Sequence, residues 1–277
     1  MRVILDTDVG LGTPGAVFDD GMAMILALNS TEMDIVGITT CHGNVNVDDA
    51  FNNAKRLALI LGKEVNVLRG SEGPMDRSKE TNDAADFIIN TSEELSDLTI
   101  IALGPLTNIA MALRRKPEIA KRWDSVFVMG GAIAVKGNVT PYAEFNVYKD
   151  PLAAKILFSL GRRIILIPLD VTRKTALTLE DLDKFFDGSR PYDEYVRYHV
   201  KKGLERMGGM CHLHDPLAVA IALDREIVGD HKVGYVEVVT KGREVGRTVL
   251  RRDARGNVDV CLDINVERFM RLLGERV

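Results

Sequence analysis

Cysteine is scarce in this sequence. The chain of 277 residues has three, Cys41, Cys211 and Cys261, and they are too scattered for a CxxC metal site or for the disulfide framework of a small secreted domain. No apolar run approaches the roughly 20 residues that a membrane span needs, and no signal-peptide cleavage region follows MRVILDTDVG. We therefore expect a reduced, cytoplasmic protein with no membrane partner.

The sequence also lacks an excess of basic residues. Acidic side chains number 40 and basic ones 36, so the formal net charge is -4. A nucleic-acid-binding domain would carry a clearly basic face, and we expect no nucleic-acid partner. The chain is 46% apolar and 27% charged, close to the average of soluble globular proteins, which excludes a disordered or collagen-like chain.

Short β-branched runs alternate with helical stretches in the N-terminal part of the chain. Continuous apolar runs are typical of parallel strands that helices cover on both faces. They occupy residues 3–6, 34–40, 97–103, 125–130 and 163–169. Candidate helices lie at 20–29, 47–62, 105–115 and 150–160. We predict an α/β fold with an open, mostly parallel β-sheet flanked by helices.

The pattern changes in the C-terminal part. Residues 178–223 look largely helical, with 191–207 the clearest helix. The strands that follow predict a small antiparallel section near the C-terminus, closed by a helix; these elements are 232–239, 247–252, 258–264 and 266–274. No linker rich in Pro, Gly or Ser interrupts the chain, so we expect a single domain over residues 1–277.

Four carboxylates gather where the first predicted strand ends and the first helix begins. Asp6, Asp8, Asp19 and Asp20 lie within 15 residues, at the end of the sheet where open α/β proteins bind ligands. One such Asp is most simply a helix cap or a turn residue. Four crowded carboxylates repel one another, however, and a hard divalent cation such as Ca²⁺ or Mg²⁺ is the usual remedy. The cluster therefore predicts a metal site.

A second motif, CHLHDPL at 211–217, lies far downstream. Asp215 precedes Pro216, which suits the first turn of a helix, so an ordinary Asp-Pro helix start is one interpretation. Beside the N-terminal cluster, Asp215 becomes a candidate fifth carboxylate. His214 becomes a candidate proton donor, because imidazole titrates near neutral pH.

Seven ordered segments resemble the inosine–uridine preferring nucleoside hydrolase family, the nucleoside N-ribohydrolases. They are ILDTDVG with DDGMAMILAL, ITTCHGN, GPLTNIAMAL, VMGGA, GNVTPYAEFNVYKDPLAAKIL, PLDVT and HDPLAVA. GPLTN or HDP alone would be a weak signal, but the seven come in the family's order over nearly the whole chain. The resemblance implies the family's fold and hydrolysis of the N-glycosidic bond of ribonucleosides to ribose and free base. It also implies a bound calcium ion (Ca²⁺), a nucleoside as the small-molecule substrate, and a homodimer or homotetramer.

The resemblance further implies roles for individual residues. Asp8 would activate the attacking water and His214 would assist the departing base. The ligands of Ca²⁺ would be Asp8, Asp20, Asp215 and the carbonyl oxygen of Leu103. The substrate-binding residues would be Asp19, Asn44, Met129, Asn138, Glu144 and Asn146. Carboxylates and amide oxygens suit this chemistry because cleavage develops positive charge on the ribose.

The sequence departs from the family's pattern after Asp8. Val9 replaces the usual Pro, and ten residues, 9–18, separate Asp8 from Asp19. This segment could add a loop beside the pocket. We favour an outward bulge that leaves both carboxylates on the metal.

A second departure concerns the base. Residues 70–87 contain no histidine, whereas purine- and pyrimidine-binding relatives often carry one there. Other groups must contact the base, and the candidates on helix 191–207 are each more simply surface or packing residues: Tyr195, Tyr198, His199 and Arg206. Base preference therefore stays open.

Two other functions are compatible with parts of the sequence. ILDTDVG also fits the motif of haloacid-dehalogenase-like phosphatases, with Asp6 as nucleophile and Asp8 as acid, but this leaves the Asp19-Asp20 pair, AEFN and HDP unexplained. A non-catalytic nucleoside- or ribose-binding protein on the same fold would bind without turnover. The presence of the whole set of candidate catalytic and metal-binding side chains argues against it.

Overall fold

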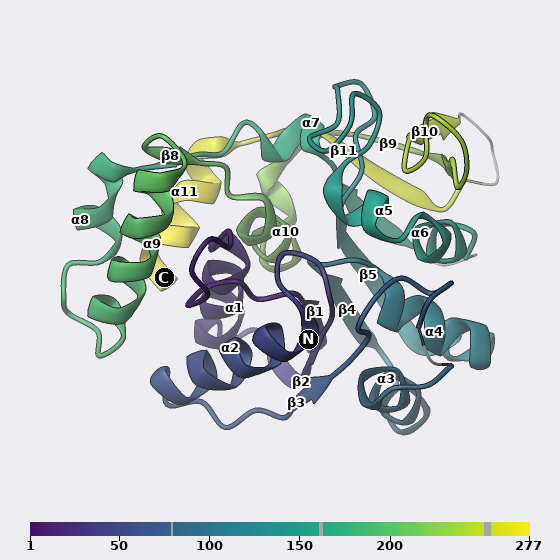
Figure 1. Cartoon of the computed structure of the whole chain (residues 1–277), viewed down its shortest axis with the longest axis horizontal. Coiled ribbons are helices and arrows are strands. Elements are labelled where there is room, and N and C mark those ends of the chain that lie inside the picture. Colours follow the sequence, from purple (N-terminus) through teal and green to yellow (C-terminus); the bar gives the residue numbers. More distant parts are fainter. Residues whose placement is uncertain (79, 161–162, 252–255) are drawn as a thin grey trace.

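A mixed β-sheet runs through the chain. The computed structural model describes residues 1–78, 80–160, 163–251 and 256–277. The strands of the main sheet are β1 (Arg2–Thr7), β2 (Asp34–Thr40), β3 (Val67–Arg69), β4 (Leu98–Ala102), β5 (Trp123–Met129), β6 (Ile164–Ile167), β9 (Val228–Val238), β10 (Thr248–Arg251) and β11 (Val258–Ile264). Their spatial order is β10-β9-β11-β6-β5-β4-β1-β2-β3 (Figure 1). A second sheet pairs β7 (Leu177–Thr178) with β8 (Met210–Cys211).

The direction of the strands matches the expected fold. β1 pairs in parallel with β2 and β4, and the parallel ladder continues through β5 and β6. β9 is antiparallel to both β10 and β11, which confirms the small antiparallel section. It is continuous with the main sheet because β11 pairs in parallel with β6. Arg252, the last residue of the predicted strand 247–252, lies outside the described residues.

Helices cover both faces of the main sheet. They are α1 (Asp19–Asn29), α2 (Val47–Ile60), α3 (Asp83–Glu94), α4 (Thr107–Arg115), α5 (Phe145–Lys149), α6 (Pro151–Phe158), α7 (Leu169–Thr172), α8 (Leu182–Phe185), α9 (Asp193–Arg206), α10 (His214–Leu223) and α11 (Val266–Arg276). In Figure 1, α3, α4 and α6 lie on one side of the sheet, and α1, α2 and α10 lie on the other. None of the described helices combines the length and the apolarity that crossing a membrane requires.

Alternation along the strands builds two apolar cores. Successive side chains of a strand point to opposite faces. Leu5 of β1 and Ile101 of β4 accordingly pack in the core with α1 and α10, whereas their neighbours Ile4 and Ile100 pack in the core with α3, α4 and α6. Because both faces are buried, these strands read as continuous apolar runs.

Several elements escape detection in the sequence. β3 is three residues long, too short for a periodic signal. α3 falls partly in the stretch 70–87, and it begins where Asn82 accepts a hydrogen bond from the backbone N–H of Ala85. The predicted helix 150–160 is preceded by α5, because Asp150 ends α5 and caps α6 through the N–H of Ala153.

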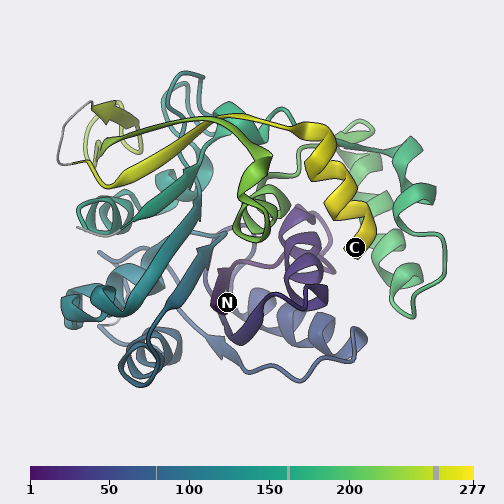
Figure 2. The ribbon, with the colours of Figure 1, turned by 180° about the vertical axis from the view of Figure 1, so that it is seen from behind.

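The C-terminal helix packs against the N-terminal part of the chain, on the α1 side of the sheet. The C-terminal helix α11 lies beside α1 (Figure 2). Asn29, at the end of α1, donates a hydrogen bond of 2.8 Å to the carbonyl oxygen of Arg276. Arg276 in turn forms an ion pair with Glu32. The N-terminal β1–α1 unit, which carries the acidic cluster, is thus braced by the last helix of the chain.

Candidate functional site

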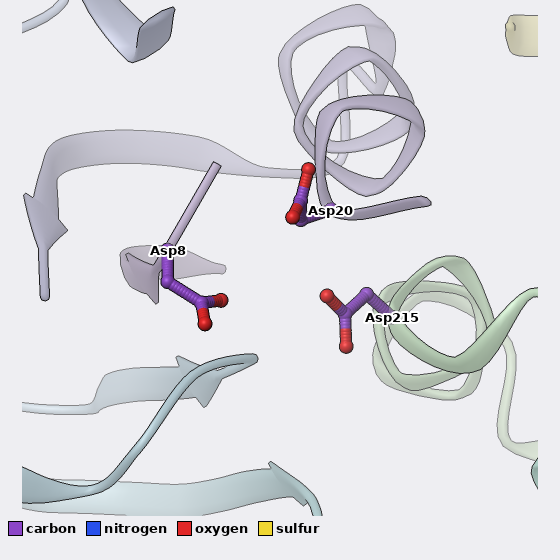
Figure 3. A group of neighbouring side chains, drawn as sticks. All are labelled: Asp8, Asp20 and Asp215. Carbon is purple, nitrogen blue, oxygen red and sulfur yellow. The ribbon is translucent and has the colours of Figure 1, made fainter. Parts of the chain in front are cut away.

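Three carboxylates from distant parts of the sequence converge on one point. Asp8 follows β1, Asp20 lies in the first turn of α1, and Asp215 lies in the first turn of α10. One oxygen from each lies within 4.8 Å of the others, and Figure 3 shows the three side chains turned toward a common space. An all-oxygen donor set of this kind suits a hard cation such as Ca²⁺ or Mg²⁺.

The three carboxylates are buried together at high electrostatic cost. Desolvation raises the pKa of Asp8 to about 7 and is the largest cause. Burial, followed by repulsion from Asp19, raises the pKa of both Asp20 and Asp215 well above the usual value. A cation among them would stabilise their charged forms. The residues present therefore fit a divalent metal ion.

Asp19 stands beside this group in a different role. Its Oδ2 accepts hydrogen bonds from the backbone N–H groups of His214 (3.0 Å) and Asp215 (3.2 Å). The first residue of α1 thus holds the first turn of α10, where the helix dipole favours negative charge. Burial raises the pKa of Asp19 to about 6.

A cavity of about 520 Å³ opens over the carboxylates. Its size lies within the range of small-molecule sites. Every residue that the sequence singled out as catalytic, substrate-binding or metal-ligating lines it: Asp8, Asp19, Asp20, Asn44, Leu103, Met129, Asn138, Glu144, Asn146, His214 and Asp215. Because they come from seven separate segments, only the fold brings them together.

Backbone N–H groups hold the carboxylate of the AEFN motif, and backbone carbonyl oxygens hold its carboxamide. Glu144 caps α5, accepting from the N–H of Asn146 (2.8 Å), and its other oxygen accepts from Gly131 (3.0 Å). Burial raises its pKa. Asn146 donates to the carbonyl oxygens of Leu103 (2.7 Å) and Met129 (3.2 Å). This side of the cavity is therefore prearranged and rich in acceptors.

The imidazole of His214 forms a hydrogen bond through its Nδ1 atom. Its Nδ1 lies 2.7 Å from the hydroxyl oxygen of Thr172. Desolvation, with His212 and Arg173 nearby, lowers its pKa to about 3. The sequence suggested an imidazole that titrates near neutral pH; burial instead disfavours the charged form, so the ring of His214 is neutral at physiological pH.

The segment 9–18 is tied down at several points. Asn44 accepts from the N–H of Val17 (3.1 Å) and donates to its carbonyl oxygen (2.9 Å), while its amide also donates to Asp20 (2.6 Å). Asn53 of α2 donates to the carbonyl oxygen of Val9 (2.9 Å). The segment leaves Asp8 and Asp20 together, as expected, but it packs against the protein instead of bulging freely, and Val17 lines the cavity.

Arg206 of α9 adds a further tie to the segment, since its guanidinium donates to the carbonyl oxygen of Ala16. The Asn44 side chain was expected to hold ribose hydroxyls. In the structure its amide nitrogen donates hydrogen bonds to the carbonyl oxygen of Val17 and to the carboxylate of Asp20, so the side chain holds Asp20 in place.

Asp6 lies outside the cavity. It is fully buried, and its Oδ1 accepts hydrogen bonds from Thr39 (2.5 Å) and Asn108 (2.8 Å). Burial raises its pKa to about 6. A nucleophile must reach its substrate, so the phosphatase alternative, which needs Asp6 exposed, does not fit the structure.

The four residues of α9 that the sequence offered for contact with the base do not line the cavity: Tyr195, Tyr198, His199 and Arg206. The groups that line the cavity near His214 come instead from the turn after α9, from β8 and from the CHLHDPL motif: Met207, Met210, Cys211 and His212. None of them was singled out from the sequence as a site residue. The one signal that could have found them was their closeness to His214 in the sequence. Uncharged side chains after a helix gave no other reason to select them.

Known proteins resemble this chain along its whole length. The family model described as "Inosine-uridine preferring nucleoside hydrolase" matches residues 3–271. Uridine nucleosidase 1 of Arabidopsis thaliana is 32% identical over 90% of this chain and 81% of its own. The pyrimidine-specific ribonucleoside hydrolase RihA of Citrobacter koseri is 31% identical over 100% of this chain and 98% of its own.

A solved structure is also similar to this chain over its whole length. The purine-preferring ribonucleoside hydrolase from Gardnerella vaginalis superposes with a TM-score of 0.90 at 31% identity, over 100% of this chain and 98% of that one. The nucleoside preferences in these names differ from one relative to the next.

Proposed function

We propose a mechanism for the reaction of this chain, which belongs to the inosine-uridine preferring nucleoside hydrolase family. The chain is a hydrolase that acts on the N-glycosidic bond of ribonucleosides. One observation carries the proposal: three converging carboxylates, the AEFN side chains and His214 line the same cavity. The products are ribose and the free base.

We assign the metal of this metal-dependent family as Ca²⁺. Asp8, Asp20 and Asp215 would hold it, together with the carbonyl oxygen of Leu103, which keeps one lone pair beside its bond from Asn146. Ca²⁺ accepts about 6–8 oxygen ligands, so positions remain for water and ribose hydroxyls. When bound, the ion lowers the pKa of a water and holds the sugar diol.

Asp8 takes the proton of the attacking water. The water oxygen bonds to C1′ of the ribose, the glycosidic C–N bond breaks, and its electron pair leaves with the base. Asp19, Asn138, Glu144 and Asn146, with Met129 along the sugar face, bind the ribose and stabilise its developing positive charge through carboxylate and amide oxygens. His214 donates a hydrogen bond to the departing base.

Release of ribose tests this mechanism. The substrates are p-nitrophenyl β-D-ribofuranoside, inosine, uridine and cytidine, each with Ca²⁺ or with EDTA. We expect Asp8→Ala to lower the rate by about 10²–10⁴-fold, the usual contribution of a general base, and EDTA to abolish it. Asp34→Ala, an exposed residue at the start of β2, is the matched control. Ribose binding without any release would leave a binding protein instead.

Three further expectations belong to the proposal. We propose that residues 1–277 act as one domain, supported by the continuous main sheet. We propose a reducing, cytoplasmic location, supported by the three free, buried cysteines. The resemblance supports a homodimer or homotetramer, which analytical ultracentrifugation measures directly.

A further inference from the structure

The helix α7 places a buried hydroxyl behind the imidazole of the site. Thr172, the last residue of α7, is fully buried. Its Oγ1 lies 2.7 Å from Nδ1 of His214. The backbone N–H of His214 is fixed separately, by Asp19 at 3.0 Å. Among the described residues the ring is hydrogen-bonded at Nδ1 alone, which leaves Nε2 for a ligand in the cavity that His214 lines.

The direction of this hydrogen bond follows from the surroundings of Thr172. Within the described part of the chain, the bond to His214 is the one side-chain hydrogen bond of this hydroxyl. If Nδ1 were the donor, the Thr172 proton would be buried without an acceptor, which is unfavourable. Thr172 therefore donates and Nδ1 accepts, so the ring carries its proton on Nε2.

We propose that Thr172 is a positioning residue that fixes His214 as the Nε2–H tautomer and so directs an N–H donor at the departing base. The inference rests on the proposed function and names a further residue for it. When the C1′–N bond breaks, the electron pair moves onto the base, and the Nε2–H group donates a hydrogen bond to the developing anion. His214 keeps its proton, and the base is protonated by solvent after release.

This role makes a prediction about leaving groups. Uridine and inosine leave as poorly stabilised base anions that need a donor. The p-nitrophenolate ion delocalises its own charge and needs none. A residue that acts only through His214 should therefore matter for the nucleosides and not for p-nitrophenyl β-D-ribofuranoside, whereas a residue that maintains the fold should matter equally for both.

The test compares variants on the two kinds of substrate. We expect Thr172→Val, which keeps the shape and removes the hydroxyl, to lower kcat/KM for uridine and inosine by about tenfold or more, the order of one hydrogen bond to a developing anion. Hydrolysis of the p-nitrophenyl substrate should stay within about twofold of the wild type. Thr172→Ser should restore the nucleoside rates. Thr99→Val, at a buried threonine of β4, controls for the loss of a buried hydroxyl.

A direct reading of the tautomer completes the test. Two-bond ¹H–¹⁵N spectra of histidine-labelled protein should show His214 protonated at Nε2 and unprotonated at Nδ1, with a His214→Asn variant to assign its signals among the five histidines. Protonation at Nδ1, or an equal loss of both activities in Thr172→Val, would overturn the inference. If the wild type cleaves neither kind of riboside, the proposed function fails, and the spectrum still decides the tautomer.

Discussion

The four aspartates of the N-terminal cluster have different partners in the folded chain. Asp6 is enclosed by Thr39 and Asn108. Asp19 binds the first amides of α10. Asp8 and Asp20 meet Asp215. Identical side chains within 15 residues thus have different surroundings: Asp6 is enclosed in the core, Asp19 braces α10, and Asp8 and Asp20 belong to the group that could hold a metal ion.

Metal binding should depend on pH, because the ligands must lose their protons. Without the ion, the pKa of Asp8 is about 7, and burial raises the pKa values of Asp20 and Asp215 well above the usual value. Protons compete with the cation as the pH falls. We expect the Kd for Ca²⁺ to weaken by roughly tenfold or more from pH 8 to pH 6, with proton release on binding. Calorimetry in buffers of different ionisation enthalpy measures both; a Kd independent of pH would contradict the cluster as the site.

The amide of Asn44 should support the same ion indirectly. It joins Asp20 to the segment 9–18 through Val17. Groups that orient a ligand typically contribute about 10–100-fold to metal affinity. We expect Asn44→Ala to weaken Ca²⁺ binding by that factor, whereas the exposed Asn52→Ala should leave it unchanged. Equal affinity in both variants would show that Asp20 needs no such support.

Among the elements, α7 and the turn after it hold two sides of the cavity. Thr172 contacts His214. Asp170 accepts from the N–H groups of Ile133 (2.9 Å) and Ala134 (2.7 Å), in the loop that carries Asn138. Arg173 donates to two carbonyl oxygens of the same loop, those of Lys136 and Gly137. A single turn of helix, with the residue after it, thus holds both His214 and the loop that carries Asn138.

Loosening this loop should weaken substrate binding. We expect Asp170→Ala to raise KM about tenfold, the order of two charge-assisted hydrogen bonds lost, with a smaller change in kcat. Under the proposed function this loop would bind the sugar, so uridine and p-nitrophenyl β-D-ribofuranoside should be affected alike, in contrast to Thr172→Val. The exposed Asp183→Ala is the control. A change in kcat alone would place the effect in the chemical step instead.

At the scale of the whole molecule, the acidic site is a local source of instability. The folded pKa values of Asp6, Asp8 and Asp19 are raised to about 6 or 7. A carboxyl group whose folded pKa exceeds its unfolded value stabilises the fold below about pH 4, and this contribution is lost as the pH rises through the folded pKa. At neutral pH the metal-free site therefore opposes folding, and a bound cation offsets this.

The melting temperature should report this balance. Ca²⁺ at about 100 times its Kd adds roughly 2.7 kcal/mol, which for a chain of this size corresponds to about 5–10 °C in Tm. We expect that increment at pH 8 and a much smaller one at pH 5 at the same Ca²⁺ concentration, where the carboxyl groups hold their protons. Differential scanning calorimetry with Ca²⁺ or EDTA measures it; an equal increment at both pH values would contradict the linkage.

The sequence by itself determined the layered α/β fold and the place of the site. Buried parallel strands must be apolar on both faces, so β1, β4, β5 and β6 show as continuous apolar runs, and ligand-binding carboxylates follow strand ends because the sheet geometry places them there. Short or irregular elements such as β3 and α5 leave no periodic signal, since their ends are set by single caps such as Glu144 and Asp150.

Only the tertiary structure decided which groups act together and in what state. The residues alone left Asp215 open as an ordinary helix start or a fifth carboxylate, and only the fold brought it to Asp8. The sequence could not put Met207 and Met210 on the wall of the cavity or show Asn44 engaged with Asp20. The sequence also led us to expect that the imidazole of His214 titrates near neutral pH, whereas burial lowers its pKa and keeps it uncharged. Desolvation, repulsion and hydrogen-bond direction depend on distances between residues remote in the chain, and those distances exist only once the sheet and its helices have packed.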